Sequence, residues 1–385
     1  MTKAMYVGVG GKARKVKKLY YGVDSKARKV KKAYIGVGGV ARPFFSSEPE
    51  LMYYGTTTPL SKARYYLATA RVGDYALFAG GLDYDGYLDT VDAYTSSLAR
   101  STPTVLSRAR DLLPATTVGN YALFGSGFTG GLIGNDTDVD AYNASLARST
   151  PTALSLGRRR LGAATVGNYA LFAGGTASGG GTAVVDAYNS SLTRSTPTAL
   201  SSARYSMAAI TTGTHALFGG GENAGTKSAV VDAYNSSLTR STPTALSSAR
   251  YWLGGAVAGS YALFAGGQES GGDSTVVDAY NSSLTRTTPT ALSQKRDEFG
   301  STSLGDYAVF GGGFSVNIYG TAVVDAYNGN LTRFVPQALS QKRGNLAAVT
   351  IGNYALFGGG QVGESSGTDL IKHPFDIVDV YTVSQ

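Results

Sequence analysis

Seven arginines recur along this 385-residue chain at an almost constant spacing. They are Arg64, Arg110, Arg158, Arg204, Arg250, Arg296 and Arg343, separated by 46, 48, 46, 46, 46 and 47 residues. A guanidinium group presents a planar fork of N–H donors, so seven of them around one opening could bind an anion or an acidic glycan. Alternatively, each Arg pairs with a repeated acid such as Asp186, or with backbone carbonyls. A feature present in every repeat more often serves the fold than one ligand, which favours the structural alternative.

The two residues that follow each of these arginines differ from repeat to repeat. They are Tyr65-Tyr66, Asp111-Leu112, Arg159-Arg160, Tyr205-Ser206, Tyr251-Trp252, Asp297-Glu298 and Gly344-Asn345. Aromatic faces pack against the C–H surfaces of sugars, and planar polar groups hydrogen-bond to hydroxyls. The pairs therefore predict a glycan-binding face, with Trp252 as the strongest candidate because a fully exposed Trp is costly. The alternative is ordinary variation of loop sequence.

Few other residues could carry catalysis or bind metal. The chain contains no Cys, and its only histidines are His215 and His373, which are too few for a His-based metal site. An Asp recurs in every repeat, which predicts structural hydrogen bonding rather than a catalytic carboxylate. These acids are Asp92, Asp140, Asp186, Asp232, Asp278, Asp325 and Asp379. We therefore expect no catalytic residue, no metal and no cofactor, so that the protein is not an enzyme.

The repeat that positions these side chains is a strand-like segment ending in two glycines. The sequence Gly-Asn-Tyr-Ala-Leu-Phe-Ala-Gly-Gly at 167–175 begins nine residues after an Arg and has a counterpart in all seven repeats. Each repeat should contain four strands, represented by 161–166, the Tyr-Ala-Leu-Phe segment, 183–188 and 192–200. Pro197 predicts that the fourth strand lies at an edge, because proline cannot donate to a sheet. Four short antiparallel strands at this period are typical of a β-propeller blade.

The two ends of the repeat region predict how the propeller closes. Third strands end in Tyr94, Tyr142, Tyr188, Tyr234, Tyr280, Tyr327 and Tyr381, and the chain stops shortly afterwards at Gln385. A fourth strand without a blade of its own, 51–60, precedes the first repeat. We expect it to complete the last blade, which would protect both edges. The predicted fold class is all-β: a seven-bladed β-propeller with N-terminal strand closure, preceded by a basic β-hairpin arm.

The Tyr-Ala-Leu-Phe-Ala-Gly-Gly strand, the later Val-Asp-Ala-Tyr strand and the Arg before each first strand resemble the kelch repeat. The resemblance covers residues 51–385 and implies that the fourth-to-first connection and the second-to-third loop open on one face. Kelch repeats usually carry a Trp on the fourth strand, where this chain has residues such as Arg194. Aromatic packing between blades is therefore expected to come from Tyr and Phe.

The N-terminal segment differs in composition from the rest of the chain. Residues 1–42 contain twelve Lys and Arg and one acid, a net charge of +11, whereas the remaining 22 basic and 25 acidic residues give −3. A 14-residue period over 5–45 predicts three β-hairpins with turns at 10–11, 24–25 and 38–39. The domain prediction is an anchoring arm over 1–45, a linker over 46–50 and the propeller over 51–385. The arm resembles N-terminal repeats of phage structural proteins.

These features predict a non-enzymatic phage virion protein of the tail, a fibre or the capsid decoration. Its arm would dock on other virion proteins, with the chain forming a homo-oligomer on the particle, and its propeller would bind a host-surface glycan or polymer. The alternative is an intracellular kelch module that binds protein partners. Protein docking is favoured over nucleic acid contact because the arm's pattern is regular. No apolar run of about 18 residues and no secretory signal occur, so we expect no membrane insertion and synthesis in the cytoplasm of a bacterial host.

Overall fold

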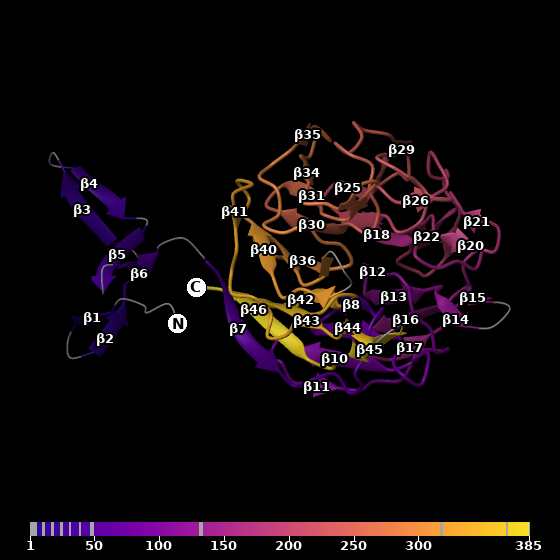
Figure 1. The fold of residues 1–385 in the computed structure, drawn as a ribbon, viewed down its shortest axis with the longest axis horizontal. Coiled ribbons are helices and arrows are strands. Elements are labelled where there is room, and N and C mark those ends of the chain that lie inside the picture. Colours follow the sequence, from indigo (N-terminus) through magenta and orange to yellow (C-terminus); the bar gives the residue numbers. More distant parts are fainter. Residues whose placement is uncertain are drawn as a thin grey trace. The chain divides into compact units, whose positions relative to one another are not determined.

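The computed structural model describes residues 6–9, 12–16, 19–23, 26–30, 32–37, 40–46, 50–130, 134–315, 319–366 and 369–384. All regular structure in these residues is β-strand, and none of them belongs to a helix capable of crossing a membrane. Seven four-stranded antiparallel sheets form a ring, as Figure 1 shows. The predicted all-β, seven-bladed propeller is confirmed.

The first strand of each blade is innermost. These strands are β8 (Ala68–Val72), β12 (Ala115–Val118), β18 (Gly162–Val166), β24 (Ala208–Thr211), β30 (Gly254–Ala258), β36 (Gly300–Leu304) and β42 (Ala347–Ile351). Each contacts the first strand of the next blade, and β42 contacts β8, so the inner wall is continuous. The blades are numbered 1 to 7 in this order.

The second strand of each blade carries the Tyr-Ala-Leu-Phe sequence or its variant. These strands are β9 (Tyr75–Ala79), β13 (Tyr121–Gly125), β19 (Tyr169–Ala173), β25 (His215–Gly219), β31 (Tyr261–Ala265), β37 (Tyr307–Gly311) and β43 (Tyr354–Gly358). After the first residue, every position is buried on both faces of the sheet. A continuous apolar run suits this place because a neighbouring blade covers each face.

The third strands are likewise buried. They are β10 (Val91–Thr95), β16 (Val139–Asn143), β22 (Val185–Asn189), β28 (Val231–Asn235), β34 (Val277–Tyr280), β40 (Val324–Tyr327) and β46 (Val378–Val383). Aromatic side chains hold one blade to the next: Leu171 and Val185 of blade 3 pack against Phe218 and Tyr234 of blade 4. The two rings meet edge to face at 6.0 Å, and the Tyr234 hydroxyl donates to the Thr198 carbonyl of blade 3 at 2.7 Å. Burying one such ring contributes roughly 1.5–3 kcal/mol.

The fourth strands lie at the outer edge, as Pro197 and its counterparts predict. They are β11 (Arg100–Ser101), β17 (Arg148–Ser149), β23 (Arg194–Ser195), β29 (Arg240–Ser241), β35 (Arg286–Thr287), β41 (Arg333–Phe334) and, in the last blade, β7 (Leu51–Thr57). The first six are shorter than the nine residues expected, because a proline two residues or so further on cannot extend the ladder.

The N-terminal strand closes the ring. The last sheet has the order β42-β43-β46-β7, so a strand from before the first repeat completes blade 7. The Ser384 N–H donates to the Glu50 carbonyl at 2.8 Å, and the Tyr53 hydroxyl donates to Asp379 at 2.7 Å. The closure predicted from the unpaired fourth strand is therefore confirmed.

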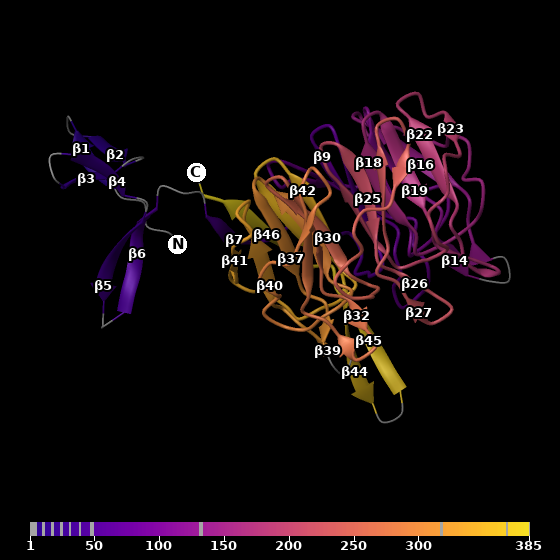
Figure 2. The same cartoon turned by 90° about the horizontal axis from the view of Figure 1, so that it is seen from above.

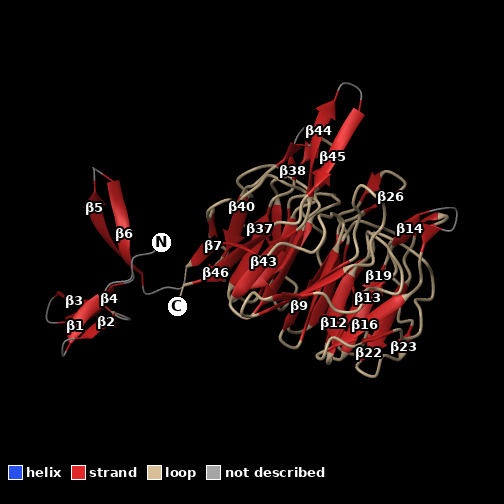
Figure 3. Ribbon diagram, turned by 90° about the horizontal axis from the view of Figure 1, so that it is seen from below, coloured by secondary structure: helices blue, strands red, loops and turns tan. Residues whose placement is uncertain are grey.

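The second-to-third loops of blades 2 to 7 carry small two-stranded ribbons that the sequence did not predict. They are β14–β15 (Phe128–Gly130, Gly134–Asn135), β20–β21 (Thr176–Ala177, Gly180–Gly181), β26–β27 (Glu222–Asn223, Thr226–Lys227), β32–β33 (Gln268–Glu269, Gly272–Asp273), β38–β39 (Phe314–Ser315, Tyr319–Gly320) and β44–β45 (Gln361–Ser366, Asp369–Pro374). The ribbons gather on one face of the propeller, where β44–β45 projects farthest (Figures 2 and 3).

Contacts divide the chain into two units, Met1–Met52 with Val383–Gln385, and Tyr53–Thr382. The first unit contains three hairpins: β1–β2 (Tyr6–Val9, Lys12–Lys15), β3–β4 (Leu19–Val23, Lys26–Val30) and β5–β6 (Lys32–Val37, Val40–Ser46). Three hairpins were predicted here, whereas the turns expected at 10–11, 24–25 and 38–39 lie outside the described residues.

Candidate functional site

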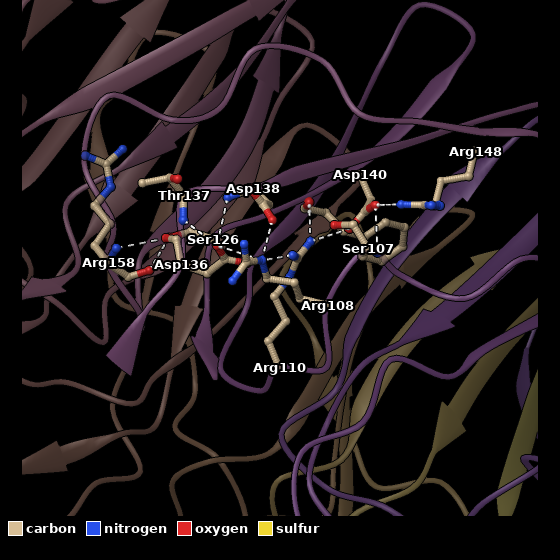
Figure 4. A network of polar contacts seen from close by, with 11 residues as sticks. Ser107, Arg108, Arg110, Ser126, Asp136, Thr137, Asp138, Asp140, Arg148 and Arg158 are labelled. Atoms are coloured by element: carbon tan, nitrogen blue, oxygen red, sulfur yellow. Dashed lines mark hydrogen bonds and ion pairs between the residues drawn. The ribbon is translucent and has the colours of Figure 1, made fainter. Parts of the chain in front are cut away.

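The seven repeated arginines form buried ion pairs. Each side chain is at most 1% exposed, and one Nη atom of each lies 2.5–2.8 Å from the repeated Asp of its blade. The pairs are Arg64–Asp92, Arg110–Asp140, Arg158–Asp186, Arg204–Asp232, Arg250–Asp278, Arg296–Asp325 and Arg343–Asp379. Figure 4 shows the pair in blade 2, where Arg110 also binds Asp136 at 2.9 Å. The anion-binding alternative is therefore wrong for these arginines, because none reaches a surface that a ligand could touch.

The repeated Asp holds the fourth-to-first connection in place. Asp186 accepts hydrogen bonds from the Ser155 backbone N–H and hydroxyl, from Arg158 and, at 2.8 Å, from Arg194 of β23. Arg158 also donates to the Phe172 carbonyl at 3.0 Å. The acid thus pairs with one buried and one partly exposed guanidinium and fixes the backbone beside them.

The glycine pair lets neighbouring blades approach closely at this face. The Gly175 N–H donates to the Arg204 carbonyl of the next blade at 2.9 Å. Gly174 has a φ of +65°, and a Cβ there would lie 2.5 Å from the same carbonyl oxygen. Only glycine combines this backbone conformation with this approach.

The first residue of each variable pair bridges to the residue that follows the glycine pair. The seven bridges are Tyr65–Leu82, Asp111–Phe128, Arg159–Thr176, Tyr205–Glu222, Tyr251–Gln268, Asp297–Phe314 and Gly344–Gln361. In blade 5, for example, the Gln268 N–H donates to the Tyr251 carbonyl at 2.8 Å, and the Tyr251 hydroxyl donates to the Gln268 side chain. The fourth-to-first connection and the second-to-third loop therefore lie side by side on one face.

The second residue of each pair belongs to a closed ring of seven backbone hydrogen bonds. Each N–H donates to the carbonyl of the equivalent residue in the preceding blade, over distances of 2.8–3.2 Å. The ring runs through Tyr66, Leu112, Arg160, Ser206, Trp252, Glu298 and Asn345, all with φ between +47° and +56°. Its members and the residues after them line a cavity of about 340 Å³, the channel cavity. The left-handed conformation occurs in every blade, so the scaffold sets the backbone and leaves the side chain free to vary.

A larger cavity of about 530 Å³ lies over blades 5, 6, 7 and 1. We call it the face cavity. Its lining includes three aromatic residues (Tyr66, Trp252 and Phe314), three acids (Asp273, Asp297 and Glu298), three amides (Gln268, Asn345 and Gln361) and two lysines (Lys295 and Lys372). A cavity of this size with aromatic walls and a few convergent polar groups is typical of a small-molecule or sugar site.

Two adjacent carboxyl groups in this cavity have strongly raised pKa values. Burial raises the pKa of Asp297 to about 8, and the nearby charges of Glu298 and Asp273 raise it further. Burial raises the pKa of Glu298 to about 7, against the opposing effects of the Arg160 charge and the Asn345 amide. Burial also raises the pKa of the Tyr66 hydroxyl. The cavity thus holds carboxyl groups whose ionisation is costly in the free protein.

The structure brings together only some of the predicted ligand residues. Tyr66, Trp252, Asp297 and Glu298 line the face cavity. Trp252 is partly buried rather than fully exposed as expected, because the Tyr251 ring packs against it at 4.4 Å.

The other predicted residues lie elsewhere on the face or below it. Arg160 lies 5.9 Å from the Trp252 ring and lines the channel cavity. Arg159 stacks on Phe128 at 4.1 Å, Tyr65 is buried, and Tyr205 is partly buried beside Glu222. These residues line no part of the face cavity.

Sequence reasoning missed Gln268, Phe314, Gln361 and the two lysines as site residues. A signal for the first three was available. The residue directly after the glycine pair, or after Ser126-Gly127 in blade 2, varies among the blades: it is Leu82, Phe128, Thr176, Glu222, Gln268, Phe314 or Gln361. Lys295 and Lys372 carry no such signal, because their place at the cavity depends on how the loops of blades 6 and 7 fold.

Comparison with known proteins bears on the fold. No protein-family model matches the sequence, and no curated protein matches it. Among solved structures, the one titled "Structure of YjhT" matches with a TM-score of 0.54 at 10% sequence identity, over 86% of this chain and 99% of that chain. At this identity the likeness concerns the fold alone, and it places the chain among β-propellers.

Proposed function

We propose that this protein is a non-enzymatic carbohydrate-binding propeller whose ligand site is the face cavity. The observation that supports this most directly is the convergence of Trp252, Tyr66 and Phe314 with amide and carboxyl side chains in one cavity. Aromatic faces match the C–H surface of a sugar ring, and planar polar groups match its hydroxyls.

The cavity is suited to hold one sugar in one orientation. Its residues come from four consecutive blades, and each blade contributes a different set of side chains. Tyr251 packs against Trp252 and its hydroxyl binds Gln268, so both side chains are held in place before a ligand arrives. Such preorganisation lowers the entropic cost of binding.

We further propose that residues 1–45 anchor the protein to other proteins of a phage particle, so that the propeller meets a host-surface glycan or polymer. The support is the resemblance of the arm's repeats to those of phage structural proteins, together with the charge of +11 over residues 1–42. Copurification with phage particles tests the anchoring role of residues 1–45. A variant that begins at Ser46 should no longer copurify, and its continued presence on the particle would contradict the anchoring role.

A glycan array probed with the full chain tests the ligand class. Trp252→Ala should weaken binding to the glycans that the native protein retains, because it removes an aromatic wall of the cavity. Tyr54→Ala is the matched control, since Tyr54 is 57% exposed on β7 and lines neither cavity. Equal binding by Trp252→Ala and the native protein would refute the site. Chemical change of a bound glycan would refute the non-enzymatic assignment.

A further inference from the structure

Asp297 differs from the seven repeated acids of this propeller in having no arginine partner in the described part of the chain. The seven repeated Asp residues are 0% exposed, and each lies within 2.8 Å of an arginine. Asp297 is only 5% exposed, yet within residues 50–130, 134–315, 319–366 and 369–384 no Lys, Arg or His forms an ion pair with it. A buried carboxyl group without a cationic partner is costly and rare.

The charges that act on the Asp297 carboxyl group make its environment more negative still. The groups that act on its carboxyl are Glu298 and Asp273, both acidic. Lys295 and Lys372 also line the cavity, but both are exposed, and Lys372 lies over the Tyr65 ring at 5.5 Å. The depth of the cavity is therefore acidic, whereas its lysines extend into solvent.

A second feature of the same cavity calls for a hydrogen-bond donor. Gln361 is 3% exposed, and its side-chain carbonyl oxygen accepts no hydrogen bond from the described residues. Such an acceptor is costly unless a donor meets it on binding. The faces of Trp252, Tyr66 and Phe314 complete the lining, and aromatic faces attract cations.

We infer that the ligand carries a protonated amine, which binds between Asp297, Glu298 and the Gln361 carbonyl against the aromatic wall. An ammonium group supplies three N–H donors and one positive charge, which matches these acceptors. A metal ion fits less well, because no cluster of three or more His, Cys, Asp or Glu in the described part of the chain could hold one. This inference rests on the proposed function and makes it specific: the sugar is a hexosamine with a free, unacetylated amino group.

Calorimetry with two matched ligands tests the inference. The full chain is titrated with a tetrasaccharide of glucosamine and with its fully N-acetylated counterpart, which differ in the charge and acetylation of the amine. The amine form should bind roughly tenfold more tightly or better, as expected for a charge-assisted hydrogen bond.

Asp297→Asn should remove most of this preference, and Glu298→Gln serves as the second variant if Asp297→Asn fails to fold. Asp111→Asn is the matched control. Asp111 is the equivalent acid of blade 2, also buried, but it lines no part of the face cavity and has Arg159, Arg160 and Lys372 as its charged neighbours. The control should retain the native preference.

The outcomes separate this inference from the proposed function. Equal affinity for the two tetrasaccharides would overturn the amine inference and leave sugar binding intact. Binding of neither tetrasaccharide, with no binding on the glycan array, would overturn both. An unchanged preference in a folded Asp297→Asn protein would overturn the assignment of the amine to this carboxyl group.

Discussion

Nη2 of Arg158 lies 2.7 Å from Oδ2 of Asp186, and both side chains are completely buried. The other oxygen of the same carboxylate binds Arg194, whose side chain is 26% exposed. One acid thus joins an inner and an outer arginine, and this arrangement recurs in six blades. In the seventh blade, which β7 completes, the Tyr53 hydroxyl donates a hydrogen bond to Asp379 in place of the outer arginine.

The inner and outer arginines should contribute very differently to stability. Arg158→Met breaks the buried ion pair and leaves Asp186 with Arg194 as its one arginine partner. It should therefore lower the free energy of unfolding by about 3 kcal/mol or more. Arg194→Met breaks a pair that solvent screens, and its effect should stay below about 1 kcal/mol. Urea denaturation followed by circular dichroism measures both. Equal losses would mean that burial does not determine the strength of these pairs.

Strand closure should determine the stability of the whole ring. Deleting residues 51–60 removes β7 and exposes the edge of β46, so we expect a large fall in melting temperature and aggregation through the free edge. Deleting residues 1–46 leaves β7 in place and is the control, with a melting temperature near that of the full chain. If the two deletions melt alike, the closing strand is not what stabilises blade 7.

Trp252 should matter for binding more than for folding. Trp252→Ala should weaken the binding of a retained glycan by about 1–3 kcal/mol, because the indole forms a wall of the face cavity. The side chain is only partly buried, so the melting temperature should fall little. Calorimetry and thermal melting of the same sample check both statements. A large loss of stability with intact binding would make Trp252 a packing residue.

The stability of the protein should depend on pH because of Asp297. Its pKa in the folded protein is about 8, above its ordinary value of 3.8, so the folded state holds this proton more tightly than the unfolded chain does. The stability that this provides is complete below about pH 4 and is lost as the pH rises to about 8. Glu298, whose pKa in the folded protein is about 7, makes stability depend on pH in the same direction. The other charged groups that line the cavity are Asp273, Lys295 and Lys372.

Asp297→Asn removes this titration. The melting temperature of the variant, relative to the native protein, should therefore rise between pH 4 and pH 8 and be highest at the alkaline end. Asp111→Asn should show a similar but smaller trend, since the pKa of Asp111 is raised only to about 7. A difference that is constant with pH, or that falls as the pH rises, would show that Asp297 is already ionised in the folded protein.

The sequence alone determined the number of blades, the order of their strands and the closure of the ring. These depend on local features: a strand period, a Gly pair, a Pro that marks an edge and one fourth strand without a blade of its own. Strand pairing within a blade joins neighbouring segments, so a repeat of about 46 residues carries the information for it.

The ligand site depended on contacts that no single repeat contains. Arg158 and Arg159 are adjacent in the chain, but Asp186 draws the first into the interior while the second lies against Phe128 of another blade. Gln268 and Gln361 are 93 residues apart, and only the ring brings both to one cavity. Burial decides whether an Arg can meet a ligand and whether a carboxyl group such as that of Asp297 lacks a partner. Burial is a property of the assembled blades, so the tertiary structure alone could settle it.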